Sequence, residues 1–217
     1  AKTLYRLYKS PGKYLELLKE RGDLLTEVAR KKSYAAVSRA ILAERIAVPA
    51  RYVINRAGGS ISLLRLQAVL LFAQIVSLAL YGVELFDEDY RPDRGHLPYK
   101  GLTQHFLDNG CFVLEIPEGA LSDAEREITD SVADAFEWYG PRAIEALLAA
   151  EHARFFADPN ASARRYVSKE RLKRCYRELF EKNSVRTMKD FEGYLHKRMT
   201  GLRHRTAQAA HGNKPLI

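Results

Sequence analysis

The side chains best able to do chemistry in this chain follow a long apolar stretch. Asp87, Glu88 and Asp89 form an acidic run that could hold a cation, and His96 and His105 lie nine positions apart beyond it. Metal sites in proteins bring several ligands together at short, regular spacings, and these two histidines lack such a spacing. An acidic run at the end of a helix usually caps or solvates that helix. We therefore predict neither a metal site nor a cofactor.

Motifs of the common enzyme classes are missing from the sequence. It contains no GxSxG nucleophile turn, no phosphate-binding P-loop, no GxGxxG and no HExxH. For His152, a hydrogen-bonded structural histidine is the preferred interpretation, and an isolated catalytic group is the alternative. We predict that the protein is not an enzyme and has no catalytic residues, with an unrecognised hydrolase as an alternative.

A polar segment, 88–101, is predicted to be a loop, because Pro92, Gly95 and Pro98 oppose regular structure. Its tyrosine and arginine side chains offer large contact area and directional hydrogen bonds, which recur at binding hot spots. An ordinary surface loop is the alternative interpretation. The predicted partner-binding residues, from this loop and from the basic C-terminal end, are Tyr90, Arg91, Asp93, Arg94, His96, Tyr99, Lys100, Arg198 and Arg203.

The net charge of +8 is unevenly distributed along the chain. Residues 1–45 carry +6 and residues 181–217 carry +5, which leaves −3 for residues 46–180. Basic ends are typical of proteins that bind nucleic acid or an acidic partner, although a solvated, solubilising surface explains them as well. The two cysteines, Cys111 and Cys175, form no disulfide framework, and the first residues resemble no secretory signal, so we expect a cytoplasmic protein.

The stretch 63–81 is apolar and long enough to span a membrane. Polar side chains, which are costly in hydrocarbon, interrupt it at Arg65, Gln67, Gln74 and Ser77. We therefore predict a buried core helix in a soluble protein that has no membrane partner. Gln67 and Gln74 share one face of this helix, and an unpaired buried polar group costs about 1–3 kcal/mol. Both are expected to tie the helix to the backbone of a neighbouring loop.

Capping residues and apolar spacing predict the other elements. Ser60 or Ser62 is the predicted N-cap of the 63–81 helix, which Gly82 should end. Ser168 is a further predicted N-cap, and Ser122 with Glu125 matches the capping box. The predicted helices cover 13–32 with a break at Gly22–Asp23, 34–44, 47–57, 122–139, 142–152, a segment after Ser168 and 187–200, before a frayed tail. The fold class is mostly α: a compact helical bundle around the buried helix 63–81, with at most one short strand or hairpin near 111–116.

Residues 61–87, ISLLRLQAVLLFAQIVSLALYGVELFD, resemble the signature of the Panacea (SocA-like) domain family. A looser similarity extends over 46–178, while Ala68, Leu71 and the loop 92–97 depart from the family pattern. The matching parts are Ser62, Leu66-Gln67, Phe72-Ala73-Gln74, Leu78-Ala79-Leu80-Tyr81-Gly82 and Leu85-Phe86-Asp87. The resemblance implies that the structural core of the motif consists of Ser62, Leu66, Gln67, Phe72, Gln74, Tyr81, Gly82, Phe86 and His152.

The resemblance also implies a domain organisation and a function. A small helical domain, 46–178, would lie between a basic N-terminal helical extension, 1–45, and a basic C-terminal helix and tail, 179–217. Members of the family resemble antitoxins that bind and neutralise a protein toxin, and some act as adaptors that deliver the toxin to a cytosolic protease. The implied partner is therefore a cognate protein toxin. A nucleic-acid-binding regulator that uses the basic N-terminal helices is the alternative, motivated by the charge of 1–45.

Overall fold

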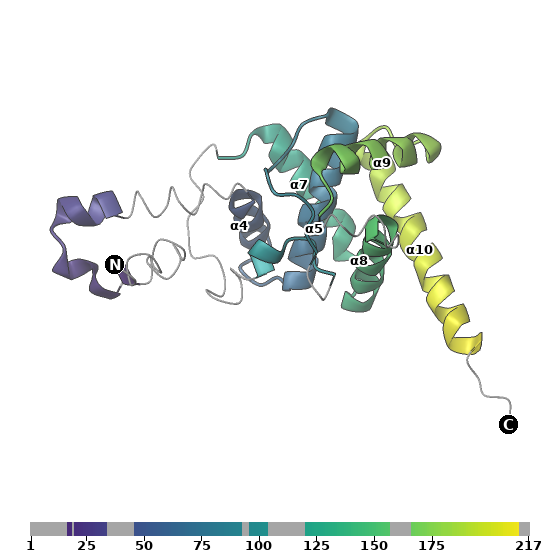
Figure 1. Ribbon diagram of the computed structural model, residues 1–217, viewed down its shortest axis with the longest axis horizontal. Helices are drawn as coiled ribbons and strands as arrows, with labels where there is room; N and C mark the ends of the chain where they lie inside the picture. Colours follow the sequence, from purple (N-terminus) through teal and green to yellow (C-terminus); the bar gives the residue numbers. More distant parts are fainter. Residues whose placement is uncertain are drawn as a thin grey trace, which may run out of the picture.

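The computed structural model describes residues 17–18, 20–33, 46–92, 96–103, 120–156 and 166–212, with side chains up to residue 203. These residues form a mostly α-helical fold, as the sequence predicts. The helices of the bundle are α4 (Ala47–Arg56), α5 (Leu63–Val76), α7 (Asp123–Glu137), α8 (Pro141–Phe156), α9 (Lys169–Lys182) and α10 (Met188–Gly212). Helix α5 lies at the centre, in contact with α4, α7, α8 and α9 (Figure 1).

The central helix α5 begins and ends where the sequence predicts. The Ser62 hydroxyl accepts a hydrogen bond from the Arg65 backbone N–H at 3.3 Å, which caps the first turn. Every side chain from 66 to 76 is buried, because neighbouring helices cover α5 on all sides. A π-helical turn, η2 (Ser77–Tyr81), continues the helix. Gly82 ends it with a φ of +77°, a left-handed conformation that glycine adopts without strain.

Burial shows that the apolar stretch is a core helix. Leu63–Tyr81 is long and apolar enough to cross a bilayer, but 78% of its most apolar window lies inside the fold. Phe72, near the middle of α5, contacts the rings of Phe136, Tyr176 and Phe191 from three other helices, with centroid distances of 5.5, 6.4 and 6.2 Å. The prediction of a buried core helix is confirmed.

The starts of the other helices also follow their sequence signals. Ser122 and Glu125 form a complete capping box at the start of α7. The Ser168 hydroxyl accepts a hydrogen bond from a backbone N–H in the first turn of α9. Pro49 lies in the first turn of α4 and Pro141 is the first residue of α8, positions at which a missing N–H breaks no hydrogen bond.

Two helices are longer than predicted. Helix α8 continues to Phe156 rather than ending at 152, and α10 continues to Gly212 where a frayed tail is expected. The predicted boundary between 178 and 179 does not divide the core. Phe191, Leu195 and Met199 of α10 pack in the same apolar cluster as the side chains of α5. Their spacing of four residues places them on one helix face, and burying that face stabilises the bundle.

The N-terminal segment breaks at the predicted position. A 3-10 turn, η1 (Gly22–Leu24), precedes a second helical piece at 27–33. The predicted helix 34–44 and the predicted strand near 111–116 lie outside the described residues. Within those residues, β-type pairing consists of two isolated bridges, Tyr90 with Val167 and Arg91 with Tyr99.

Candidate partner-binding site

The loop after α5 is fastened to the central helix by its two buried glutamines. The Gln74 side-chain amide donates to the Phe86 carbonyl and accepts from the Leu85 N–H, both at 2.8 Å. Two turns earlier, Gln67 donates to the Tyr99 carbonyl at 3.2 Å and accepts from the Tyr99 N–H at 2.7 Å. The predicted role of both glutamines is confirmed, because each satisfies its buried amide through the backbone of the loop.

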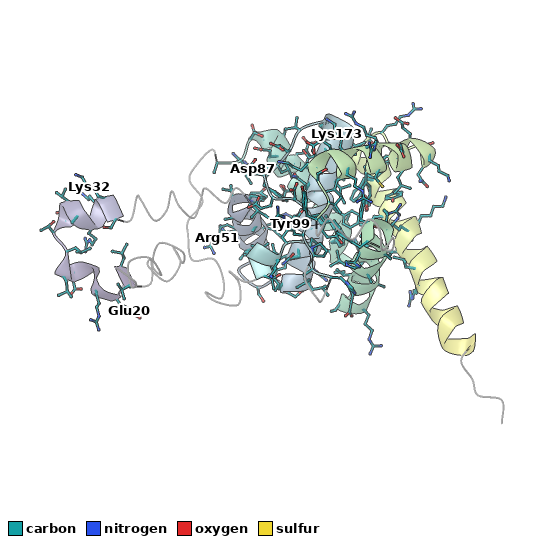
Figure 2. The ribbon with its side chains drawn as sticks, viewed as in Figure 1. Glu20, Lys32, Arg51, Asp87, Tyr99 and Lys173 are labelled. Carbon is teal, nitrogen blue, oxygen red and sulfur yellow. The ribbon has the colours of Figure 1, made fainter. Side chains whose placement is uncertain are left out.

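This fastening buries the loop tyrosines that the sequence predicts as partner-binding residues. Tyr90 and Tyr99 are 0% and 3% exposed, and Tyr99 lies inside the bundle (Figure 2). Tyr90 packs edge-on against Phe155 and Phe156 of α8, with ring centroids 6.1 and 5.8 Å apart. Desolvation by burial raises the pKa of both phenols. The partner-binding prediction is wrong for these two tyrosines, because core packing has made them inaccessible.

Two basic residues predicted to bind a partner, Arg91 and Lys100, remain at the surface. Arg91 and Lys100 are exposed, and the Arg91 guanidinium lies 4.9 Å from the centre of the Tyr166 ring. Such a cation–π contact orients Arg91 without removing it from solvent. The partner-binding prediction for Arg91 and Lys100 therefore stays a prediction. Asp93 and Arg94, from the same prediction, lie outside the described residues.

His96 and His152 hold the loop against α8. Their ring centroids are 4.3 Å apart, and the His152 ring also stacks on Phe156 at 4.9 Å. His96 has a φ of +61°, which is uncommon for a residue other than glycine. Desolvation, together with the neighbouring His96 ring, lowers the pKa of His152. These contacts support a structural histidine at 152, held by ring stacking, and place His96 partly out of reach of a partner.

Arg198, predicted to contact a partner from the C-terminal end, points inward instead. Its guanidinium forms an ion pair with Glu151 of α8, a fully buried carboxylate. Glu151 also accepts a hydrogen bond from the Tyr176 hydroxyl and lies 3.2 Å from the Arg154 Nε. The prediction is wrong for Arg198, because a buried carboxylate needs a charged partner and Arg198 supplies it. Arg203, one turn further along α10, is exposed.

Tyr81 is the motif residue that departs from its predicted place in the core. It is 53% exposed because it lies at the end of η2. Beside it, Lys173 and Arg177 of α9 donate hydrogen bonds to the carbonyls of Gly82 and Ala79, each at 3.3 Å, as cations do at a helix C-terminus. The remaining motif residues of this stretch cap the helix or fill the interior: Ser62, Leu66, Gln67, Phe72, Gln74, Gly82 and Phe86.

Trp138, to which the sequence analysis assigns no role, is the most exposed large apolar side chain among the described residues, at 85%. It lies in the short turn between α7 and α8. This turn is held from two sides: Arg65 donates to the Tyr139 carbonyl at 2.9 Å, and the Tyr139 hydroxyl lies 3.3 Å from Nδ1 of His196. Leaving a large apolar side chain in water forgoes on the order of 2 kcal/mol of burial free energy. A fixed turn thus presents an indole to solvent.

A cavity of about 200 Å³ lies at the base of this turn. Glu137 and Pro141, which flank Trp138 in the chain, both line it. Its apolar wall comes from α4, α5, α8 and the segment before α5, through Val53, Val69, Ile144 and Ile61. Arg56 and Arg65 complete the lining. Pockets for cofactors and drug-sized ligands are larger, about 300–1,000 Å³, so this cavity fits a single inserted side chain.

The charges around the cavity are unbalanced. Arg56 forms an ion pair with Asp130 at 2.8 Å, contacts Asp134 and lies 3.9 Å from Glu137. Its hydrogen bond with Asp134 raises the pKa of Arg56, so this arginine stays protonated. The Tyr52 hydroxyl donates to Asp130 at 2.9 Å and holds that carboxylate in place. Arg56 therefore faces three carboxylates of α7, of which Glu137 lines the cavity together with Arg56 and Arg65.

We call Trp138, together with the cavity that Arg56, Arg65 and Glu137 line, the Trp138 surface. An exposed tryptophan that directly follows a lining residue of a cavity of side-chain size, with two arginines and one glutamate in that lining, has the composition of an interface hot spot. The sequence signal for it is the stretch 137–141, Glu-Trp-Tyr-Gly-Pro. A helix that stops at glycine and proline places its last side chains on a surface turn.

Comparisons of this chain with protein-family models, with curated proteins and with solved structures found no match. The similarity to the Panacea family therefore stays a prediction that rests on the residues quoted from 61–87 and, more loosely, from 46–178.

Proposed function

We propose that this chain is a cytoplasmic antitoxin, which neutralises a protein toxin by binding it through the Trp138 surface. The observation that carries the binding role is the 85% exposure of Trp138 on a turn that α5 and α10 hold in place. The antitoxin role draws its support from the resemblance of residues 61–87 to the Panacea signature. Delivery of the bound toxin to a cytosolic protease belongs to the same proposal, since the resemblance implies it for some members.

The Trp138 surface supports binding for an energetic reason. Tryptophan and arginine dominate interface hot spots, because each offers a large contact area together with directional interactions. The turn is already ordered in the free protein, so little conformational entropy is lost when a partner covers it. Arg56 and Arg65 are likewise fixed by their hydrogen bonds to Asp134 and Tyr139. The surface is preorganised.

The test is co-expression with the product of the neighbouring gene. That product alone should stop growth, and this chain should restore it. Trp138→Ala should abolish the rescue, since truncating a hot-spot residue costs at least about 2 kcal/mol, roughly a thirty-fold weaker Kd. Isothermal titration calorimetry with the purified pair measures that Kd.

Tyr81→Ala is the matched control. Tyr81 is also an exposed aromatic residue, 53% accessible, but it lies at the opposite end of the central helix from the cavity. This variant should rescue growth as the wild type does. A harmless neighbouring product, or full rescue by Trp138→Ala, would refute the proposal. Loss of rescue with Tyr81→Ala alone would move the binding surface to the other end of α5.

A nucleic-acid-binding regulator is the second candidate. It is supported by Arg30, Lys31 and Lys32, which are exposed at the end of the helical piece 27–33, although Lys31 pairs with Glu27 at 2.9 Å (Figure 2 labels Lys32). Phosphate contacts would make the affinity fall steeply with salt. Binding of labelled duplex DNA and single-stranded RNA, followed by fluorescence anisotropy across a salt series, measures this slope. Absence of binding at low salt would eliminate the candidate.

A further inference from the structure

The exposed face of α7 carries carboxylates on every turn. Asp123, Glu127, Asp130, Asp134 and Glu137 follow one another at intervals of three or four residues, so they lie on one side of the helix. The side chains of Asp123, Asp134 and Glu137 are 101%, 58% and 65% exposed, and Glu127 is exposed as well. We call these five residues the α7 acidic stripe. Trp138 is the next residue after its C-terminal end.

Nearby arginines only partly neutralise this stripe. Arg56 contacts Asp130 and Asp134 and approaches Glu137, and Arg126 lies 3.7 Å from Asp123 within the same helix. Helix α7 contains six acidic residues and one basic residue, so these two arginines leave the surface net negative. Because most of these carboxylates are exposed, a partner's charges can reach them.

The stripe has the opposite sign to the chain as a whole. The net charge of +8 comes from the two ends of the chain, whereas residues 46–180, which include α7, carry −3, so a positively charged partner is attracted at this helix and repelled by the ends. Complementary charge of this kind directs encounter and fixes orientation more than it adds affinity. The apolar anchor at the end of the stripe, Trp138 with its cavity, would supply the affinity.

We propose that the partner of the Trp138 surface is a protein with a lysine- and arginine-rich face, which lies along the α7 acidic stripe while one of its side chains enters the cavity. This inference rests on the proposed function and specifies its partner. The site is defined by the exposed tryptophan and the cavity, and the carboxylates determine which kind of surface fits beside them. A basic face is what a protein that acts on nucleic acid uses to bind phosphates, so covering it would block that activity.

The chain contains a reporter at this surface. Trp138 is its only tryptophan, so a change in tryptophan emission on binding comes from this position. The probe is a short synthetic peptide rich in lysine and arginine that contains no tryptophan. A glutamate-rich peptide of equal length and a single-stranded RNA oligonucleotide serve as comparison ligands. Titration of the full chain at low salt with the basic peptide should change the Trp138 emission, and added salt should weaken the apparent affinity.

Charge variants locate the binding. The double variant Glu127→Gln and Glu137→Gln should weaken peptide binding by about five-fold, since each exposed charge pair contributes modestly. Both side chains are exposed, and thermal unfolding followed by circular dichroism checks that the fold is retained. The matched control is Glu178→Gln with Glu181→Gln, which removes two exposed carboxylates of α9. It should change the affinity by less than about two-fold.

The outcomes separate this inference from the proposed function. If the basic peptide leaves the emission unchanged at low salt, or if the glutamate peptide or the RNA binds as well, the partner is not a basic protein and the inference fails. If the two double variants weaken binding equally, the stripe is not its site. Toxin neutralisation that depends on Trp138 could still hold in either case. If peptide binding depends on the stripe but the neighbouring gene product is not toxic, the inference about a basic partner holds and the antitoxin role is refuted.

Discussion

Two connections between helices of this bundle have the opposite roles to those that their compositions predict. The loop 88–101, rich in tyrosine and arginine, resembles an interface, yet Tyr90 and Tyr99 are core residues held by buried glutamines and aromatic rings. The short turn between α7 and α8 resembles an ordinary helix end, yet it exposes Trp138 beside a cavity. Composition indicates which side chains can form a hot spot, and packing determines which of them a partner can reach.

The difference originates in hydrogen bonding. A loop that crosses a buried helix must satisfy its own backbone groups, and Gln67 and Gln74 do this for Tyr99, Leu85 and Phe86. Once the backbone is held there, the adjoining aromatic side chains point into the core. The turn at Trp138 is held by the hydrogen bond from Arg65 to the Tyr139 carbonyl, and this bond leaves the Trp138 side chain in solvent. Substitutions in the loop should therefore affect stability, and those in the turn should affect binding.

Glu151→Ala should have the largest effect on stability. It would leave the buried Tyr176 hydroxyl and the half-buried Arg198 guanidinium without this acceptor, which should lower the free energy of unfolding by about 3–5 kcal/mol. Urea denaturation followed by circular dichroism measures this change. Glu178→Ala, which removes an exposed carboxylate of α9, should stay within about 0.5 kcal/mol of the wild type. An equally small loss for Glu151→Ala would mean that Arg198 is free to meet a partner after all.

Gln74→Ala should be the next most damaging change. It removes the partner of the Leu85 N–H and of the Phe86 carbonyl, and unpaired buried groups cost about 1–3 kcal/mol each, so the free energy of unfolding should fall by roughly 2–4 kcal/mol. In the same denaturation experiment Trp138→Ala should stay within about 0.5 kcal/mol of the wild type. If Trp138→Ala were as destabilising as Gln74→Ala, the turn would be structural and the contrast would disappear.

The paired histidines should make the loop sensitive to acid. The pKa of His152 is lowered in the folded state by desolvation and by His96, so the unfolded chain binds the proton more readily. The free energy of unfolding should therefore fall as the pH drops below the ordinary value of 6.5, until it passes the lowered pKa of the folded state. Thermal unfolding between neutral pH and mild acid measures this slope.

Two substitutions sharpen that experiment. His152→Gln should flatten the slope, because the titrating ring is removed. His196→Gln is the matched control, since His196 is exposed on α10, and it should retain the wild-type slope. A slope that survives His152→Gln would assign the pH dependence to other groups.

Tyr90→Phe should have the smallest effect. Among the described residues, the Tyr90 hydroxyl is buried without a hydrogen-bond partner, so its removal should leave the free energy of unfolding unchanged or raise it by up to about 1 kcal/mol. Partner binding should also be unchanged, as measured by calorimetry. If Tyr90→Phe weakened binding as strongly as Trp138→Ala, this hydroxyl would reach the partner, and the assignment of the loop to the core would be wrong.

Local signals allowed much of the fold to be predicted from the sequence. Ser62, Ser122 and Ser168 cap their helices as predicted, and the break at 22–24 follows from glycine and aspartate. The part played by Gln67 and Gln74 could also be predicted, because a buried amide has few ways to satisfy its hydrogen bonds. The length of α10 could not, since its last turns combine basic residues with few apolar ones and resemble a tail.

The sequence by itself determined the mostly α fold, the helix boundaries near capping residues and the burial of 63–81, because these follow from the spacing of apolar and capping side chains along one chain. Only the tertiary structure decided that Arg198 pairs with Glu151, that Tyr90 and Tyr99 lie in the core and that Glu137, next to the exposed Trp138, lines a cavity. These facts depend on which residues, distant in sequence, meet when six helices pack. No local pattern encodes that arrangement.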